Sequence, residues 1–186
     1  MKKYTQPGIF SIMVMLSCII LCIVLLFIIG FDEALPVAII SFVILIFIVC
    51  LFIFYKLTII IDDTHLTFSM GIGLISKSYP LSDIKSCTPV KNSVLWGVGV
   101  HMTPSGWLYN VSGLSSVELS FKNRKAKILI GTDRPDEVVE AVRAKINGVQ
   151  AGSFYEKSGK QGIYLAVAVL TLIIGILIFI LVSGHQ

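Results

Sequence analysis

The sequence predicts an integral membrane protein with three transmembrane helices and one compact, mostly β domain between the second and the third. Hydrophobic residues make up 55% of the 186-residue chain and charged residues only 14%, whereas soluble domains carry about 25% charged residues. The deficit is confined to three uncharged runs, at residues 9–30, 35–54 and 163–182. Residues 56–147 instead form short alternating segments separated by turn residues, which is typical of antiparallel strands.

Each uncharged run is long enough to cross a bilayer, whose hydrocarbon core needs about 20 helical residues. A segment exposed to lipid must satisfy its own backbone hydrogen bonds, so each run is expected to be helical. The first run follows Lys2 and Lys3 and contains Ser17-Cys18, features that a cleaved signal sequence would also show. However, the run continues well past Cys18 without a small-residue cleavage motif, so a retained helix is predicted.

The charges that flank the runs predict their orientation. The basic flanking residues are Lys2, Lys3, Lys56, Lys157 and Lys160, whereas the turn between the first two runs carries Asp32 and Glu33. Basic residues in short flanks tend to stay in the cytoplasm. We therefore expect residues 1–8 and the middle domain to be cytoplasmic and the C-terminus to lie outside a cell (inner) membrane.

The four cysteines predict neither a disulfide framework nor a metal site. Three of them, Cys18, Cys22 and Cys50, lie inside predicted membrane helices. Cys18 and Cys22 are one helical turn apart, and small residues in such positions usually pack against a neighbouring helix. Cys87 stands alone in a domain that we place in a reducing compartment.

The middle domain divides into eight predicted strands. They span residues 56–61, 65–70, 75–79, 85–88, 98–102, 107–111, 117–121 and 127–130. Turn-forming residues separate them, for example Asp62-Asp63-Thr64 and Thr103-Pro104-Ser105-Gly106. Short strands at such regular spacing predict an antiparallel meander that closes into a small sandwich or barrel.

One amphipathic helix is predicted after the strands. Asp133 is the expected N-cap, Pro135 lies in the first turn, and Asp136 and Glu137 complement the positive end of the helix dipole. The apolar stripe that would cover the end of the barrel consists of Val138, Val139, Val142 and Ile146. A linker rich in glycine and serine, residues 148–161, then leads to the third run and is expected to be flexible.

Over residues 55–146 the chain resembles the pleckstrin-homology-like (PH-like) domains of small bacterial membrane proteins. The stretches that carry the resemblance are Leu57–Asp63, Ser78–Ile84, Trp96–Gly99 with Gly106–Gly113, and Ile130–Asp133. The resemblance implies an antiparallel β sandwich or barrel capped by a C-terminal helix. Eukaryotic PH domains that hold phosphoinositides use basic residues around the first hairpin, whereas the loop here is acidic. No phosphoinositide site is therefore expected.

No catalytic, metal or cofactor site is predicted, and no nucleic-acid partner. His65, His101 and His185 are scattered, and none lies near a cysteine or carboxylate at the spacing of metal ligands. Motifs of hydrolases, zinc proteases and nucleotide-binding loops are missing from the sequence. Gly71-x-Gly73 and Gly97-x-Gly99 lead into strands and not helices, so they are interpreted as turn or bulge glycines.

Two surface features are candidate binding sites. Lys122, Arg124, Lys125 and Lys127 cluster on one hairpin and are a candidate contact for anionic membrane lipids, with an ordinary solvated turn as the alternative. Leu95 and Trp96 form a candidate partner or interface loop, because a loop tryptophan can anchor at headgroups, contact a partner or pack on its own domain. Trp107 and Tyr109 share one strand face and are expected to fill the core.

The sequence therefore favours a non-enzymatic, multi-pass membrane protein that presents a PH-like domain to a protein partner or to membrane lipids. The alternative is an accessory subunit of a transporter or channel complex. The predicted helices contain no charged residue, so neither a proton relay nor an ion pathway is visible within this chain. The sequence predicts no oligomeric state.

Overall fold

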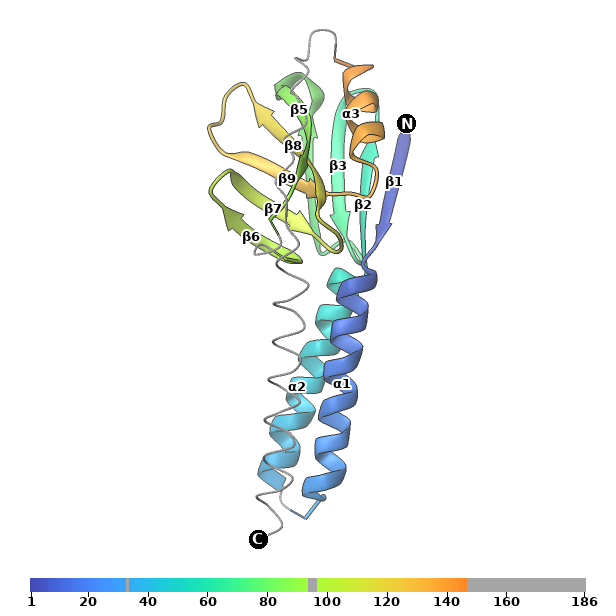
Figure 1. The fold of residues 1–186 in the computed structure, drawn as a ribbon, viewed down its shortest axis with the longest axis vertical. Helices are drawn as coiled ribbons and strands as arrows, with labels where there is room; N and C mark the ends of the chain where they lie inside the picture. The colour runs from blue at the N-terminus through green and yellow to red at the C-terminus, as the bar shows by residue number, and fades with distance from the viewer. Residues whose placement is uncertain (33, 94–96, 147–186) are drawn as a thin grey trace.

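Two long helices extend from one end of a β domain in the computed structural model, which describes residues 1–32, 34–93 and 97–146 (Figure 1). Helix α1 spans Ile9–Ile29 and α2 spans Ala34–Phe54, within one residue of the first two predicted runs. By length and composition both can cross a membrane. The third predicted run, residues 163–182, and the linker, residues 148–161, lie outside the described residues.

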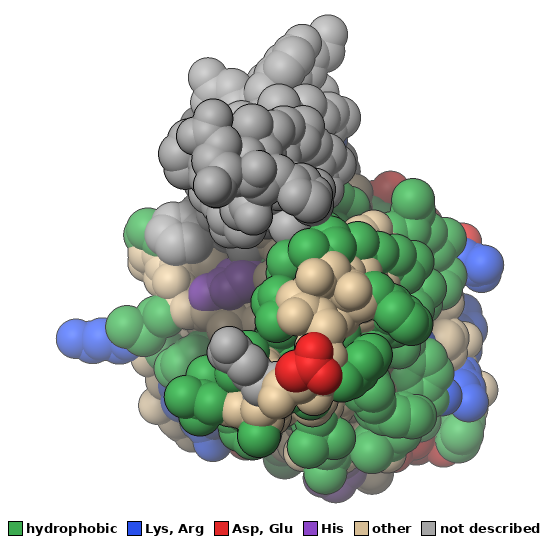
Figure 2. All heavy atoms as spheres, turned by 90° about the horizontal axis from the view of Figure 1, so that it is seen from below, with side chains coloured by type: hydrophobic (Ala, Val, Ile, Leu, Met, Phe, Trp, Pro, Cys, Tyr) green, Lys and Arg blue, Asp and Glu red, His purple; other side chains and the backbone are tan. Residues whose placement is uncertain are grey.

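The two helices lie side by side and expose their apolar side chains. Ser11 is the single buried residue of α1, and α2 has none. Figure 2 shows the molecule from the helix end, where hydrophobic side chains cover the helix pair and the surface around it, and charged groups lie mostly at the rim. Nothing in the described part of the chain covers these helices as the core of a soluble protein would.

The N-terminal segment is a strand, which the sequence analysis did not predict. Strand β1 (Lys2–Pro7) pairs antiparallel with β2 (Lys56–Ile61), from Lys2 opposite Ile61 to Pro7 opposite Lys56. The expectation for residues 1–8 concerned only their cytoplasmic location, which stays a prediction. The segment belongs to the β domain, and the hairpin of α1 and α2 is inserted between two adjacent strands of one sheet.

The domain contains two sheets. The first has the order β1-β2-β3-β4 and the second the order β5-β8-β9-β7-β6. The remaining strands are β3 (His65–Met70), β4 (Ile75–Pro80), β5 (Ile84–Lys91), β6 (Gly99–Thr103), β7 (Gly106–Asn110), β8 (Ser115–Phe121) and β9 (Lys127–Gly131). The short helix η1 (Leu81–Asp83) connects the sheets. All eight predicted strands are confirmed, with small shifts at their ends.

The second sheet is mixed, so the prediction of a purely antiparallel meander was wrong. Strands β7 and β9 pair in parallel, from Gly106 opposite Lys127 to Tyr109 opposite Ile130. The chain leaves β7, pairs as β8 with β5, and returns as β9. Strand β9 lies between β7 and β8. It pairs antiparallel with β8 and parallel with β7.

The core lies between the sheets and is closed by helix α3 (Pro135–Arg143), which packs against β5 and β8. The aromatic rings of Phe68 and Tyr109 meet across the core at 4.7 Å between centroids. The predicted apolar stripe of α3 is confirmed, because Val138, Val139 and Val142 are buried and Ile146 packs against the core. The predicted N-cap was wrong, since Arg134 occupies that position without a side-chain cap.

Trp107 does not fill the core, contrary to the sequence-based expectation. Tyr109 is buried, whereas 43% of the surface of Trp107 is exposed. Tyr109 contacts Phe68 of the facing sheet, and Trp107 lies two residues earlier on β7, about 7 Å further along the strand. Its exposed neighbour across the β6–β7 ladder is Met102.

Candidate functional site

The helix pair joins the domain where β1 ends and β2 begins. The backbone N–H of Gly8 donates a hydrogen bond to the carbonyl of Tyr55 at 2.8 Å. A Cβ at Gly8 would lie 2.2 Å from the carbonyl oxygen of Phe54, which is closer than any real contact. Only glycine therefore lets the start of α1 approach the end of α2 this closely.

The turn between β3 and β4, residues 71–74, packs against the end of α2. We call it the base turn. The N–H of Gly71 donates to the carbonyl of Lys56 at 2.8 Å, and that of Ile72 donates to the carbonyl of Phe52 at 3.2 Å. The last carbonyls of a helix have no partner within the helix, so the base turn satisfies one of them. Gly71 has φ +54°, and a Cβ there would lie 2.0 Å from the oxygen of Phe52.

The second sheet is tied to α1 as well. The hydroxyl of Ser11, in the first turn of α1, donates to the carbonyl of Val111 at 2.6 Å. The amide Nε2 of Gln6, in β1, donates to the carbonyl of Ser112 at 2.7 Å. Both acceptors lie in the connection between β7 and β8. We call these contacts, together with those of Gly8 and the base turn, the helix–sheet junction. Because both sheets take part, the junction fixes how the domain sits on the helices.

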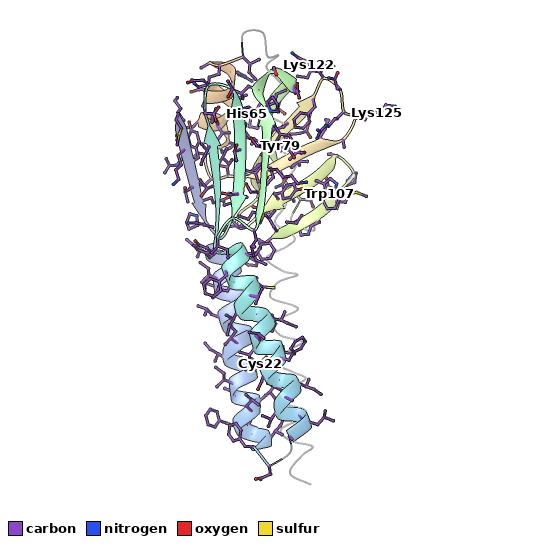
Figure 3. All side chains as sticks on the ribbon, turned by 180° about the vertical axis from the view of Figure 1, so that it is seen from behind. Cys22, His65, Tyr79, Trp107, Lys122 and Lys125 are labelled. Atoms are coloured by element: carbon purple, nitrogen blue, oxygen red, sulfur yellow. The ribbon has the colours of Figure 1, made fainter. Side chains whose placement is uncertain are left out.

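The basic hairpin lies at the other end of the domain. Figure 3 shows Lys122 and Lys125 far from α1 and α2. Lys127 is engaged, because its Nζ pairs with Glu118 Oε1 at 2.7 Å. Lys122, Arg124 and Lys125 are exposed, and the guanidinium of Arg124 lies over the Phe121 ring at 5.8 Å. The structure therefore groups three exposed cations but does not bring them to the helix ends, where a membrane crossed by α1 and α2 would begin.

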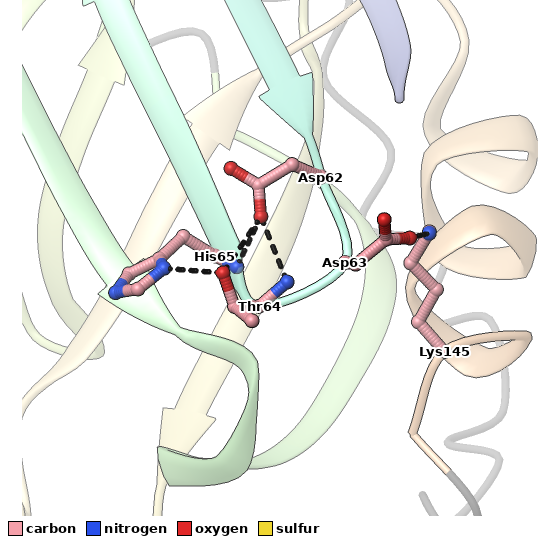
Figure 4. Close-up of polar contacts among 5 residues, drawn as sticks. All are labelled: Asp62, Asp63, Thr64, His65 and Lys145. Atoms are coloured by element: carbon pink, nitrogen blue, oxygen red, sulfur yellow. Dashed lines mark hydrogen bonds and ion pairs between the residues drawn. The ribbon is translucent and has the colours of Figure 1, made fainter.

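The acidic turn between β2 and β3 is a structural element (Figure 4). Asp62 Oδ1 accepts hydrogen bonds from the N–H of Thr64 at 2.8 Å and of His65 at 2.6 Å, and these bonds lower the pKa of the Asp62 carboxyl. Asp63 forms an ion pair with Lys145, which follows α3, and this contact lowers the pKa of the Asp63 carboxyl. The two carboxylates thus fix the turn and attach the end of α3 to it.

The described residues bring together no cluster of side chains that could hold a metal ion. Within residues 1–32, 34–93 and 97–146, no three His, Cys, Asp or Glu side chains come together as metal ligands. His65 Nδ1 lies 2.8 Å from the Thr64 hydroxyl, whereas His101 lies on β6 in the other sheet. Cys87 is fully buried, and burial raises the pKa of its thiol to about 12, which makes it a poor nucleophile.

Leu95 and Trp96, the predicted partner loop, lie outside the described residues, as does His185. The position just after the loop is held in place, since Asn110 Nδ2 donates to the carbonyl of Gly97 at 3.1 Å. The glycines of Gly71-x-Gly73 and Gly97-x-Gly99 all have positive φ, in agreement with their interpretation as turn or bulge glycines.

Sequence reasoning missed the helix–sheet junction. Two local signals pointed to it. Ser11 is a hydroxyl residue at the very start of an uncharged run, and the base turn places the large apolar Ile72 and Leu74 beside glycines. Neither signal predicts which residue is contacted, because the partners, Val111 for Ser11 and Phe52 for Ile72, are distant in the sequence.

Comparison with models of protein families, with curated proteins and with solved structures found no match. The PH-like resemblance therefore stays a prediction.

Proposed function

We propose that this chain is a membrane protein in which α1 and α2 form a transmembrane hairpin, and that its β domain is a non-enzymatic binding module held at the membrane surface. One observation carries the proposal: an exposed, apolar helical hairpin is inserted between the adjacent strands β1 and β2. Both ends of the hairpin are therefore fixed to the same side of the same domain. The PH-like resemblance is part of this proposal, although the parallel pair of β7 and β9 departs from its antiparallel pattern.

The exposure of the helices argues for lipid as their environment. Met13, Phe27 and Leu35 are each more than 60% exposed, and such residues recur along both helices. Soluble monomers rarely expose contiguous apolar patches larger than a few hundred Å². The backbone N–H and C=O groups within a helical hairpin are hydrogen-bonded to each other. The hairpin can therefore lie in hydrocarbon without leaving these groups unpaired.

The inserted hairpin also restricts the topology. Since Pro7 and Lys56 are paired, the N-terminus and the β domain lie on one side of the membrane and the turn at Asp32 on the other. The basic flanks Lys2, Lys3 and Lys56 favour the cytoplasm for the domain side.

Sided thiol labelling tests this arrangement. The background replaces Cys18, Cys22 and Cys50 with Ala and keeps the buried Cys87, which should stay unlabelled. A membrane-impermeant maleimide should label Asp32→Cys in intact cells and Lys125→Cys only in inside-out vesicles. The reason is that Asp32 lies in the outer turn and Lys125 on the domain. Labelling of both positions from the same side would overturn the proposed hairpin.

The end of the domain remote from the helices is the surface open to a soluble partner. Its exposed cations, Lys122, Arg124 and Lys125, project from one hairpin, and the carboxylates of Asp62 and Asp63 in the β2–β3 turn already have structural partners. Complementary charge increases the rate of encounter and the selectivity of such contacts. We therefore favour a protein partner with an acidic surface over the lipid surface of the same membrane.

Co-purification in mild detergent tests the binding role. We expect a soluble protein to co-purify with the full chain at low salt and to be lost several-fold when Lys122, Arg124 and Lys125 are changed to Gln. The matched control changes the exposed Lys77 and Lys85 to Gln and should retain it. If a membrane protein instead co-purifies in a stoichiometric amount, and equally well with the triple Gln variant, the accessory-subunit alternative is supported. That result would contradict the basic hairpin as the binding surface.

A further inference from the structure

The base turn exposes two large apolar side chains. Ile72 is 62% exposed and Leu74 69% exposed. Between residues 56 and 146, the only other large hydrophobic side chains that the described structure leaves exposed are Met102 and Trp107. Exposing two large apolar side chains to water is unfavourable. The position of the turn relative to the helices therefore indicates what could cover them.

The base turn reaches the level of the last turn of α2. The hydrogen bond from Ile72 to Phe52 joins the turn to a residue that lies two positions inside the end of α2, about 3 Å along the helix axis. Tyr55 and Lys56 follow the helix, with the Lys56 ammonium 4.9 Å from the centre of the Tyr55 ring. Aromatic and basic residues of this kind mark the headgroup level at the end of a membrane helix. The turn therefore extends past the headgroup level toward the hydrocarbon.

The turn is also open on its outer side. A Cβ at Gly73 would meet no atom of the described residues within 4 Å, and the side chains on either side of Gly73 are the exposed Ile72 and Leu74. Their apolar surface adjoins α2 at Phe52, which is itself 54% exposed. The surface that would face lipid on α2 thus continues onto the domain.

We propose that the base turn inserts Ile72 and Leu74 into the membrane interface beside α2, where the acyl chains of lipids cover them. The inference rests on the proposed membrane crossing of α1 and α2. Lipid is favoured over a protein partner because the backbone contacts with Phe52 and Lys56 hold the turn at the depth where the helix enters the bilayer. Together with the helices, the inserted turn gives the domain a further point of contact with lipid and resists tilting of the domain on the membrane.

Lipid quenching of a fluorophore tests the inference in the full chain, reconstituted in liposomes. An environment-sensitive probe is attached to Ile72→Cys or Leu74→Cys in the background that retains only Cys87. Controls carry it at Lys125→Cys, an exposed position remote from the helices (Figure 3), and at Val49→Cys within α2. Probes at positions 72 and 74 should emit at shorter wavelength than the probe at position 125 and be quenched by lipids brominated on the acyl chains. Aqueous iodide should quench them several-fold less than it quenches the probe at position 125.

The two failures can be told apart. If the probe at position 49 is quenched by brominated lipid but those at positions 72 and 74 respond to iodide as the probe at position 125 does, the inserted turn is wrong and the membrane hairpin stands. If the probe at position 49 is also open to iodide and untouched by brominated lipid, the membrane crossing itself is wrong and the inference fails with it.

Discussion

Replacing Val142 with Asp is expected to detach α3 from the β domain and to expose the thiol of Cys87. Val142 is completely buried in the core that α3 closes. A carboxylate there would be an unpaired buried charge, which costs about 3–5 kcal/mol when nothing compensates it. Protonation of the new carboxyl would lower this cost but would leave a polar group without a partner in the core, so release of the helix is expected. Because α3 packs against β5, the strand that carries Cys87 would lose its cover.

Maleimide labelling of Cys87 measures this opening in the background that lacks the three helix cysteines. When opening is fast, the labelling rate is proportional to the fraction of molecules in which Cys87 is uncovered. A loss of about 3 kcal/mol in stability should therefore raise the labelling rate at least about a hundredfold. Glu140→Asp is the matched control, because it places the same residue on the exposed face of α3 and should leave the rate near that of the parent. An unchanged rate for Val142→Asp would show that α3 does not pack as described.

Changing Gly71 to Ala is expected to break the base turn away from α2. Its positive φ of +54° alone costs a residue with a Cβ about 1–2 kcal/mol. The added Cβ would lie 2.0 Å from the Phe52 oxygen, so the turn must also shift. The shift removes the hydrogen bonds of Gly71 and Ile72 to α2 and β2, each worth about 1 kcal/mol. The expected total is about 3–4 kcal/mol.

Gly73→Ala separates the cost of the positive φ from the cost of losing the hydrogen bonds of the base turn. Gly73 also has a positive φ, +99°, but in the described part of the chain a Cβ there meets no atom within 4 Å. It should cost only the backbone term, so the two variants are expected to differ by about 2 kcal/mol in the free energy of unfolding. Urea unfolding in detergent, followed by labelling of Cys87, gives both values. Equal midpoints for the two variants would contradict the close approach of the base turn to α2.

Local patterns in the sequence were sufficient for most individual elements. The helices α1 and α2 follow from uncharged runs of the right length, and the strands β2 to β9 from alternation bounded by turn residues. The buried face of α3 follows from the spacing of Val138 and Val142. Each of these properties depends on neighbouring residues alone, which is why a single sequence shows them.

The candidate site could not be predicted in the same way. Lys122, Arg124 and Lys125 were recognisable as a cluster, yet their distance from the helix ends depends on how the hairpin of β8 and β9 is oriented in the domain. Trp107 and Tyr109 share a strand face by spacing, but the extent of the facing sheet decides that only Tyr109 is covered.

The amino-acid sequence alone indicates that this chain carries apolar helices of membrane-crossing length and a strand-rich domain ending in an amphipathic helix. Three features follow instead from the folded arrangement: residues 2–7 form β1, β9 lies parallel to β7, and the base turn meets α2. Each of these depends on partners distant in the chain. The Lys2–Pro7 segment has no strong strand pattern of its own and becomes a strand because β2 offers it an open edge across the inserted hairpin.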